Sequence, residues 1–138
     1  YDNADGSNAN FDVFNIDTNG DVQMDGTATA DAFYHNSDKE LKTDIKKIDN
    51  ALEKILSIED VSFKWKENNE KGIGLLAQDV EGVFPELVSI NEETGLKTVD
   101  YGKIVAPLIG AIKEQQGAIN KQQEEIETLK RELNKLKE

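Results

Sequence analysis

Ser37 and Lys42 are two residues whose types and spacing could support catalysis. A serine hydroxyl is a weak nucleophile until a base removes its proton, and a desolvated lysine amine can serve as that base. Residues i and i+5 of one helix point about 140° apart, so this pair needs a bend or a second chain to bring it together. The same hexapeptide has a structural alternative, in which Ser37 and Glu40 form a capping box that opens a short helix.

Other kinds of catalytic or metal site have little support in the composition. His35 is the one histidine, and a Ser-His-Asp triad would need it to contact Ser37, which the alternating direction of neighbouring side chains disfavours. The absence of Cys excludes thiol catalysis and cysteine-bound zinc. Segment 17–21 begins like a calcium loop, but Val22 and Ala28 stand where that loop needs Gly and Glu. The sequence therefore predicts no metal site and no cofactor.

The charge of the chain is distributed unevenly. Its 138 residues carry a net charge of −12, and residues 1–36 hold seven Asp but no Lys or Arg. Residues 37–138 hold the other 21 acidic side chains and all 16 basic ones. Such an acidic chain is a poor partner for nucleic-acid phosphates and anionic membranes, and no apolar run approaches the roughly 20 residues of a membrane-spanning helix. The step near residue 36 indicates two differently built segments.

Residues 1–36 are expected to be β-structured. Segments 11–17 and 21–26 alternate in part between apolar and polar residues around Thr18-Asn19-Gly20, which predicts two short strands joined by a turn. A hairpin this small and polar does not fold alone. We therefore expect it to pair with further strands upstream or on other chains.

Residues 37–100 have the pattern of a small α+β domain. Helical spacing, alternation and turn residues predict five features in order. These are a helix with Asp49 as N-cap, a half-buried strand at 61–65, a short buried strand at 73–77, a helix ended by Pro85, and a hairpin turning at 91–95.

Residues 101–138 are predicted to form a long helix with Asp100 as N-cap. A regular heptad repeat begins at Val105, which favours a coiled coil over a helix packed only on its own domain. Pro107, early in the helix, is expected to cost one hydrogen bond or to kink it. The a positions are Val105, Ile112, Ile119, Ile126 and Leu133, and the d positions are Leu108, Gln115, Gln122, Leu129 and Leu136.

The charged flanks of this repeat favour parallel chains. Glu125 and Glu132 fall at g, and Lys130 and Lys137 fall at e. Each Glu can therefore pair with the Lys of the next heptad on a parallel partner. Within one helix the same pairs face apart and gain little. The pattern predicts a parallel homo-oligomer without fixing its number of chains.

Several motifs, in order and at matching spacing, resemble a known family. They are similar to the C-terminal intramolecular chaperone domain of phage tail fibres, tailspikes and endosialidases, the peptidase S74 family, and the resemblance spans about residues 34–138. The motifs are Ser37-Asp38-x-x-Leu41-Lys42, the helix 51–55 with the aromatic strand 61–65, Ile73-Gly74-Leu75-Leu76-Ala77-Gln78-Asp79-Val80 with Phe84-Pro85-Glu86-Leu87-Val88, and Val99-Asp100-Tyr101-Gly102-Lys103-Ile104-Val105.

Two positions depart from the family pattern. Glu40 stands where the family commonly has Arg, which places an anion near Lys42 and would make it a poorer base. Many members carry a basic or His residue just before the Gly-Leu strand, where this chain has Lys71, Gly72 and Ile73. If such a residue assists cleavage in other members, either no residue of this chain has that role or Lys71 has it.

The resemblance implies a homotrimeric intramolecular chaperone that registers an upstream fibre segment, its client, and then releases itself by autoproteolysis. By this resemblance Ser37 is the nucleophile and Lys42 its base, while Asp38 orients the bend or holds Lys42. The expected cleavage site is the bond between Asn36 and Ser37, with the bond between Ser37 and Asp38 as an open alternative. Which chain's lysine serves which serine is also open.

The expected domains are the end of a β-fibre at 1–36, an α+β chaperone domain at 37–100 and a coiled-coil trimerisation helix at 101–138. The implied location is the virion, as part of a tail fibre, spike or appendage, after assembly in the bacterial cytoplasm and release of the chaperone part. The implied partners are copies of the chain and the client segment, with no nucleic acid and no membrane. The alternative is a structural trimerisation or fibre-tip module that does not cleave. A receptor-binding tip has less support, because the single Trp, Trp65, falls on an expected core strand.

Overall fold

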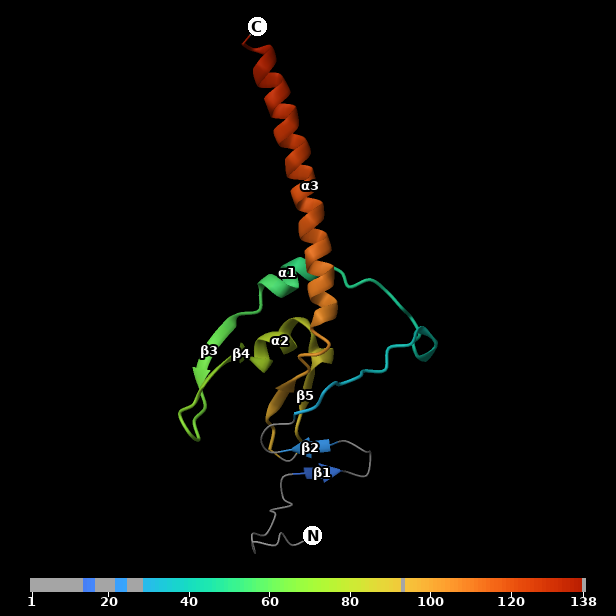
Figure 1. The fold of residues 1–138 in the computed structure, drawn as a ribbon, viewed down its shortest axis with the longest axis vertical. Coiled ribbons are helices and arrows are strands. Elements are labelled where there is room, and N and C mark those ends of the chain that lie inside the picture. Colours follow the sequence, from blue (N-terminus) through green and yellow to red (C-terminus); the bar gives the residue numbers. More distant parts are fainter. Residues whose placement is uncertain (1–13, 17–21, 25–28, 93, 138) are drawn as a thin grey trace, which may run out of the picture. The chain divides into compact units, whose positions relative to one another are not determined.

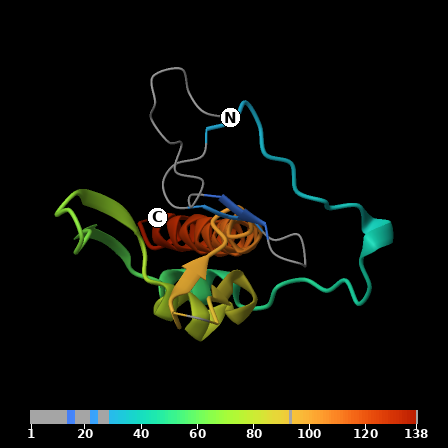
Figure 2. The ribbon, with the colours of Figure 1, turned by 90° about the horizontal axis from the view of Figure 1, so that it is seen from below.

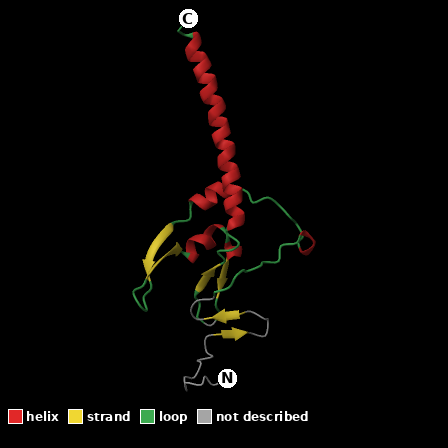
Figure 3. Cartoon of the chain, viewed as in Figure 1, coloured by secondary structure: helices red, strands yellow, loops and turns green. Residues whose placement is uncertain are grey.

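The computed structural model describes residues 14–16, 22–24, 29–92 and 94–137 (Figure 1). Contacts divide the chain into two compact units, Tyr1–Ile45 and Lys46–Glu138. Helices and two-stranded antiparallel sheets make up the fold, so the predicted mixed α+β class is confirmed (Figure 3). In the part of the chain that the structure describes, no helix combines the length and the apolar character that crossing a membrane requires.

Among its described residues, the first unit contains one short strand pair and one turn of 3-10 helix. Strand β1 (Phe14–Ile16) runs antiparallel to β2 (Val22–Met24), with Phe14 opposite Met24. The predicted pair of strands is confirmed, while the turn at 17–21 lies outside the described residues. The 3-10 helix spans Lys39–Leu41.

Where the structure describes it, the second unit combines three α-helices with two hairpins. The long helix α3 rises from a base formed by the shorter elements (Figure 1). In chain order the elements are α1 (Ala51–Leu56), β3 (Asp60–Lys64), β4 (Lys71–Leu75), α2 (Ala77–Val83), a 3-10 helix (Pro85–Leu87), β5 (Val88–Ile90), β6 (Lys97–Val99) and α3 (Val105–Lys135).

The hairpin β3–β4 confirms two predicted strands but not the predicted burial of the second. Ile73, at the centre of β4, is 87% exposed. The reason is that glycine occupies the alternate positions of this strand. A Cβ atom at Gly72 would lie 2.7 Å from the ring of Phe63. The aromatic ring therefore covers the glycine face of β4, and Ile73 points to the opposite face.

The core of the second unit is small. Val80 is buried in the middle of α2, Phe84 is buried directly after its last residue, and Leu87 is buried in the 3-10 helix that follows. Burying one such side chain contributes about 1.5–3 kcal/mol. The predicted stop of α2 before Pro85 and the predicted hairpin β5–β6 are both confirmed. Partly buried residues pack around this core from α1, the strands and the start of α3: Ile48, Ile55, Ile58, Leu75, Val83, Val88, Val99 and Ile104.

Helix α1 packs on the base of α3, and both α1 and α2 lie on one side of that helix (Figure 2). The approach is close, because a Cβ atom at Gly110 of α3 would lie 2.8 Å from the Cβ atom of Ala51. The helices meet through small residues, since Ala51 is fully buried and Ala111 is 4% exposed.

The N-terminus of α1 is not capped as predicted. The residue before the helix is Asn50 in the left-handed region, with no side-chain cap, so the prediction of Asp49 as N-cap is wrong. The carboxylate of Glu114, on α3, accepts hydrogen bonds from the backbone N–H groups of Ala51 at 3.2 Å and Leu52 at 2.9 Å. A carboxylate from a distant helix thus satisfies the free donors of the first turn.

These hydrogen bonds lower the pKa of Glu114. The bond from Leu52 is the largest cause, the bond from Ala51 and the positive charge of Lys47 act in the same direction, and partial burial opposes them. The ionised carboxylate is therefore the form that holds α1 against α3.

The start of α3 differs from the prediction in two details. The helix begins at Val105, and Asp100 caps the turn before it by accepting a hydrogen bond from the N–H of Lys103 at 3.0 Å. Pro107 falls in the first helical turn. A residue there has no N–H partner within the helix, so the expected loss of a hydrogen bond does not arise.

Candidate functional site

Ser37 and Lys42 contact each other in the first unit. The Nζ atom of Lys42 lies 2.8 Å from the Oγ atom of Ser37 and 3.0 Å from its carbonyl oxygen. The distance to the hydroxyl lies within the range for proton transfer between a nucleophile and a base. Both residues come from one chain, so no second copy is needed to form the contact.

The local sequence explains how residues five apart can meet. Asp38 is the N-cap of the 3-10 helix, and its Oδ1 atom accepts a hydrogen bond from the N–H of Glu40 at 2.9 Å. Lys42 follows the helix in extended conformation, and its N–H donates to the carbonyl of Lys39 at 3.1 Å. Because the chain turns tightly and Lys42 directly after the turn is extended, the lysine side chain comes back to Ser37.

The capping box expected from Ser37 and Glu40 is wrong. Asp38 provides the capping oxygen, one residue later than predicted. The hydroxyl of Ser37 is thereby free of a capping role and interacts with Lys42 instead. Asp38 acts on the backbone turn, which is the first of the two roles considered for it.

The remaining predicted residues of this segment are exposed. His35 and Asn36 precede the serine in a stretch that is neither helix nor strand, and Ser37 and Lys42 are themselves open to solvent in the single chain. Lys71, the possible substitute for the family's basic residue, is the exposed first residue of β4 in the second unit.

The described residues contain no group of three His, Cys, Asp or Glu side chains that could hold a metal ion. The segment 17–21, which begins like a calcium loop, lies outside them.

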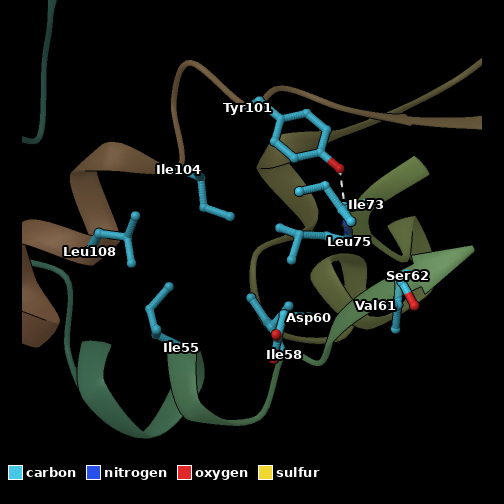
Figure 4. Close-up of a pocket in the computed structure, with 11 residues that line it drawn as sticks. Ile55, Ile58, Asp60, Val61, Ser62, Ile73, Leu75, Tyr101, Ile104 and Leu108 are labelled. Carbon is cyan, nitrogen blue, oxygen red and sulfur yellow. Dashed lines mark hydrogen bonds between the residues drawn. The ribbon is translucent and has the colours of Figure 1, made fainter. Parts of the chain in front are cut away.

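A separate apolar groove of about 720 Å³ lies in the second unit, between α1, the hairpin β3–β4 and the start of α3. Ile55, Ile104 and Leu108 point into it from the two helices (Figure 4). At its other side the N–H of Leu75 donates to the hydroxyl of Tyr101 at 2.9 Å. Sequence reasoning did not find this groove, because its walls come from segments far apart in the chain.

The comparison with protein families matches the segment that begins at the candidate nucleophile. Residues 37–89 fit the family model of the peptidase S74 domain, described as chaperone of endosialidase. This segment of the chain is therefore similar to a peptidase S74 domain. The matched range starts at Ser37 and includes Lys42, the hairpin β3–β4 and the small core, so the predicted resemblance is confirmed.

A phage protein is also similar to much of the chain. The long tail fiber protein Gp37 of Salmonella phage S16 is 32% identical over 113 residues. The aligned region covers 75% of this chain but 14% of the fibre protein. This chain thus spans a small part of the relative's length.

Proposed function

We propose that this chain is the end of a phage fibre joined to its intramolecular chaperone, which trimerises, registers the fibre chains and then releases itself by autoproteolysis. The observation that carries the proposal is the contact between Ser37 Oγ and Lys42 Nζ at 2.8 Å, at the first residue of the S74 domain. The similarity to a long tail fiber protein supports the fibre as the client.

In the proposed reaction, neutral Lys42 takes the proton of the Ser37 hydroxyl while Oγ attacks a peptide carbonyl carbon. The bond from Oγ to that carbon forms, and the carbon–nitrogen bond of the peptide breaks. The proton passes from Lys42 to the leaving amine. Water then hydrolyses the ester, which restores the serine hydroxyl and leaves a new carboxylate.

We propose that the bond cut is the one between Asn36 and Ser37. The carbonyl carbon of Asn36 is bonded to the serine nitrogen, so attack by Oγ closes a ring through Cβ, Cα and N. Attack on the serine's own carbonyl carbon would close a smaller and more strained ring. The carbonyl oxygen of Ser37 is also held by Lys42 at 3.0 Å, which fits a bond that remains intact.

Assembly would control this reaction by excluding water from Ser37 and Lys42. Ser37 and Lys42 are exposed in the single chain, and a lysine accepts a proton only as the neutral amine, which desolvation favours. We propose that packing of the assembled fibre over this segment excludes water and activates the pair. Cleavage would then follow registration rather than precede it.

The long helix α3 supports the trimerisation part of the proposal. It continues as one helix through Lys135, and its heptad residues Ile112, Ile119, Ile126 and Leu133 are 45–63% exposed in the single chain. Such a stripe is buried in a coiled coil. The family implies three chains. Joining them raises their local concentration, which offsets the entropy of closing long-range contacts between fibre strands.

The proposed boundaries follow from this mechanism. Residues 1–36 end the fibre, residues 37–100 form the chaperone domain, and residues 101–138 form the trimerisation helix. After cleavage the fibre would persist in the virion without the part that ordered it, held by a kinetic barrier to unfolding.

A non-cleaving structural module is the second candidate, and one observation favours it. Lys42 Nζ donates to both the hydroxyl and the carbonyl oxygen of Ser37. An ammonium group makes such bonds, and in that role it would only fasten the turn. The Ser37→Ala variant separates the two functions. Under the proposal it gives one uncut band on a denaturing gel while the unchanged chain gives two. Identical processing of both proteins would contradict the assignment of the nucleophile.

A further inference from the structure

The first two turns of α3 present two different apolar faces. At heptad positions c, f and g, Pro107 and Ala111 are buried and Gly110 lies against α1. The a, d and e positions carry large apolar side chains that remain exposed. They are Val105, Leu108, Ile109 and Ile112, with exposed fractions of 54%, 40%, 49% and 63%. One face is thus covered by the chain's own α1, and the other is open.

The apolar groove lies on the boundary between these faces. Ile104 and Leu108 form its wall on α3, and Ile55 faces them from α1 (Figure 4). Ile104 has right-handed helical backbone angles, so it continues the helical register into position g. Leu108 is a d residue, which makes the groove continuous with the proposed coiled-coil seam.

The register of that seam brings a specific side chain to the groove. In a parallel coiled coil, a g residue lies beside the e residue of the next heptad on the neighbouring helix. This rule pairs Glu125 with Lys130 near the C-terminus. At the start of the helix the same spacing pairs Ile104 with Ile109, so apolar side chains replace the ion pair. Since α1 lies on the g side, the neighbour's e residue arrives next to α1 as well.

We propose that the groove is a socket for α3 of a second copy of this chain, with the neighbour's Ile109 seated between Ile104, Leu108 and Ile55. This inference rests on the parallel coiled coil of the proposed function and adds to it the interface between coiled coil and domain. Each copy would insert one helix into the next copy's socket and receive one in turn.

The chemistry of the groove fits a helix better than a small polar ligand. Binding sites for small molecules hold a few convergent polar groups in an apolar cavity. Here the polar lining residues Asp60, Ser62 and Tyr101 come from outside the two helices, and the hydroxyl of Tyr101 already accepts a hydrogen bond from the N–H of Leu75. The helix side is built from aliphatic residues, which match an isoleucine side chain.

The socket would connect assembly to the fold of the domain. Ile55 packs on the core formed by Val80, Phe84 and Leu87. A neighbour seated against Ile55 therefore stabilises α1 and the core as well as the coiled coil. The domain becomes most stable only when the chains have associated in register.

Engineered disulfides test the socket, because the chain has no natural Cys. The variant Ile55→Cys with Ile109→Cys is oxidised and run on a denaturing gel without reductant, in a Ser37→Ala background that keeps each chain in one piece. The socket predicts covalent trimers, which only bonds between chains can produce. The matched variant Ile55→Cys with Gly117→Cys places the second thiol at an outward f position, where a Cβ atom meets nothing within 4 Å, and should give none.

A third variant, Glu125→Cys with Lys130→Cys, tests the parallel coiled coil by itself. Covalent trimers from this pair together with the socket pair support the inference. If Glu125→Cys with Lys130→Cys gives trimers but Ile55→Cys with Ile109→Cys gives only monomers, the socket is overturned and the coiled coil stands. Monomers from both pairs, in variants with unchanged helix content by circular dichroism, overturn the coiled coil and the socket together.

Discussion

Lys42 Nζ lies 2.8 Å from Ser37 Oγ. The two residues are five positions apart, and the segment between them contains only the short 3-10 helix. The 3-10 turn capped by Asp38 creates this contact. One geometry thus serves two interpretations, a base next to a nucleophile and a cation that fastens a turn. Substitutions that keep the charge but remove the basicity distinguish them.

Lys42→Ala and Lys42→Arg should both slow self-cleavage by at least about 100-fold, the contribution typical of a positioned base. Arginine keeps the positive charge and the hydrogen-bond donors but does not give up its proton in proteins. Densitometry of denaturing gels over time measures the rate. Normal cleavage in Lys42→Arg would show that the cation only fastens the turn.

Asp38→Ala should slow cleavage, whereas Asp38→Asn should leave most of it. Asparagine is as good an N-cap as aspartate, and the bond from the N–H of Glu40 needs only a side-chain oxygen. The readout is again the cleavage rate, with circular dichroism to confirm folding. Equal losses in both variants would instead assign a role to the negative charge of Asp38.

Much of the fold follows from local patterns, and the exceptions have identifiable causes. The alternation at 61–65 and the heptad repeat of α3 can each be recognised within one continuous segment of the sequence. The cap supplied by Glu114 joins residues more than sixty positions apart, so no local pattern contains it. Ile73 belongs to a strand pattern, but its exposure depends on which partner side chain covers the neighbouring glycines.

The sequence pointed to the contact between Ser37 and Lys42 but not to the turn that forms it. The types of Ser37 and Lys42 indicated the chemistry, and the need for a bend followed from helical geometry. The capping residue was assigned one position too early. Asp38 competes with Ser37 for this role, and an aspartate bonded to the N–H two residues later is a common turn signal that favours Asp38.

Glu114→Gln should lower the melting temperature by several degrees at neutral pH. The lowered pKa of Glu114 means that its ionised form stabilises the fold. That contribution is fully present above the unfolded-state pKa of about 4.3 and is lost as pH falls through the lower folded-state value. The difference between variant and unchanged chain should therefore shrink below about pH 4. Melting curves from pH 3 to pH 7 measure it.

Glu124→Gln is the matched control for that experiment. Glu124 is exposed on the same helix, at the outward f position, so its substitution should change the melting temperature little at any of these pH values. A response equal to that of Glu114→Gln would assign the effect to the net charge of the helix.

Gly110→Ala and Gly117→Ala should change stability in opposite directions. Both glycines lie within α3, but a Cβ atom at Gly110 would lie 2.8 Å from Ala51 while one at Gly117 meets nothing within 4 Å. We expect Gly110→Ala to destabilise by about 1–3 kcal/mol and Gly117→Ala to stabilise by about 0.8–1 kcal/mol. Urea unfolding measures both. Stabilisation by both substitutions would contradict the close packing of α1 on α3.

Reversing the charges along α3 tests the parallel register. Glu125→Lys with Glu132→Lys should weaken association, and so should Lys130→Glu with Lys137→Glu, because like charges would then meet between chains. Mixing the two variants should restore association, by about 0.2–1 kcal/mol for each pair. Sedimentation equilibrium at low and high salt measures this, and salt should reduce the effect. Equal association of each variant alone and of the mixture would exclude the parallel pairing.

The most direct test of self-release is the intact mass of the freshly expressed chain, followed over time under conditions where it associates. We predict two products that divide between Asn36 and Ser37, with masses that sum to the full chain plus one water, and a larger product whose N-terminal residue is Ser37. The Ser37→Ala chain should keep its full mass throughout. A single full-length mass for the unchanged, associated chain after long incubation would contradict autoproteolysis and favour the structural module.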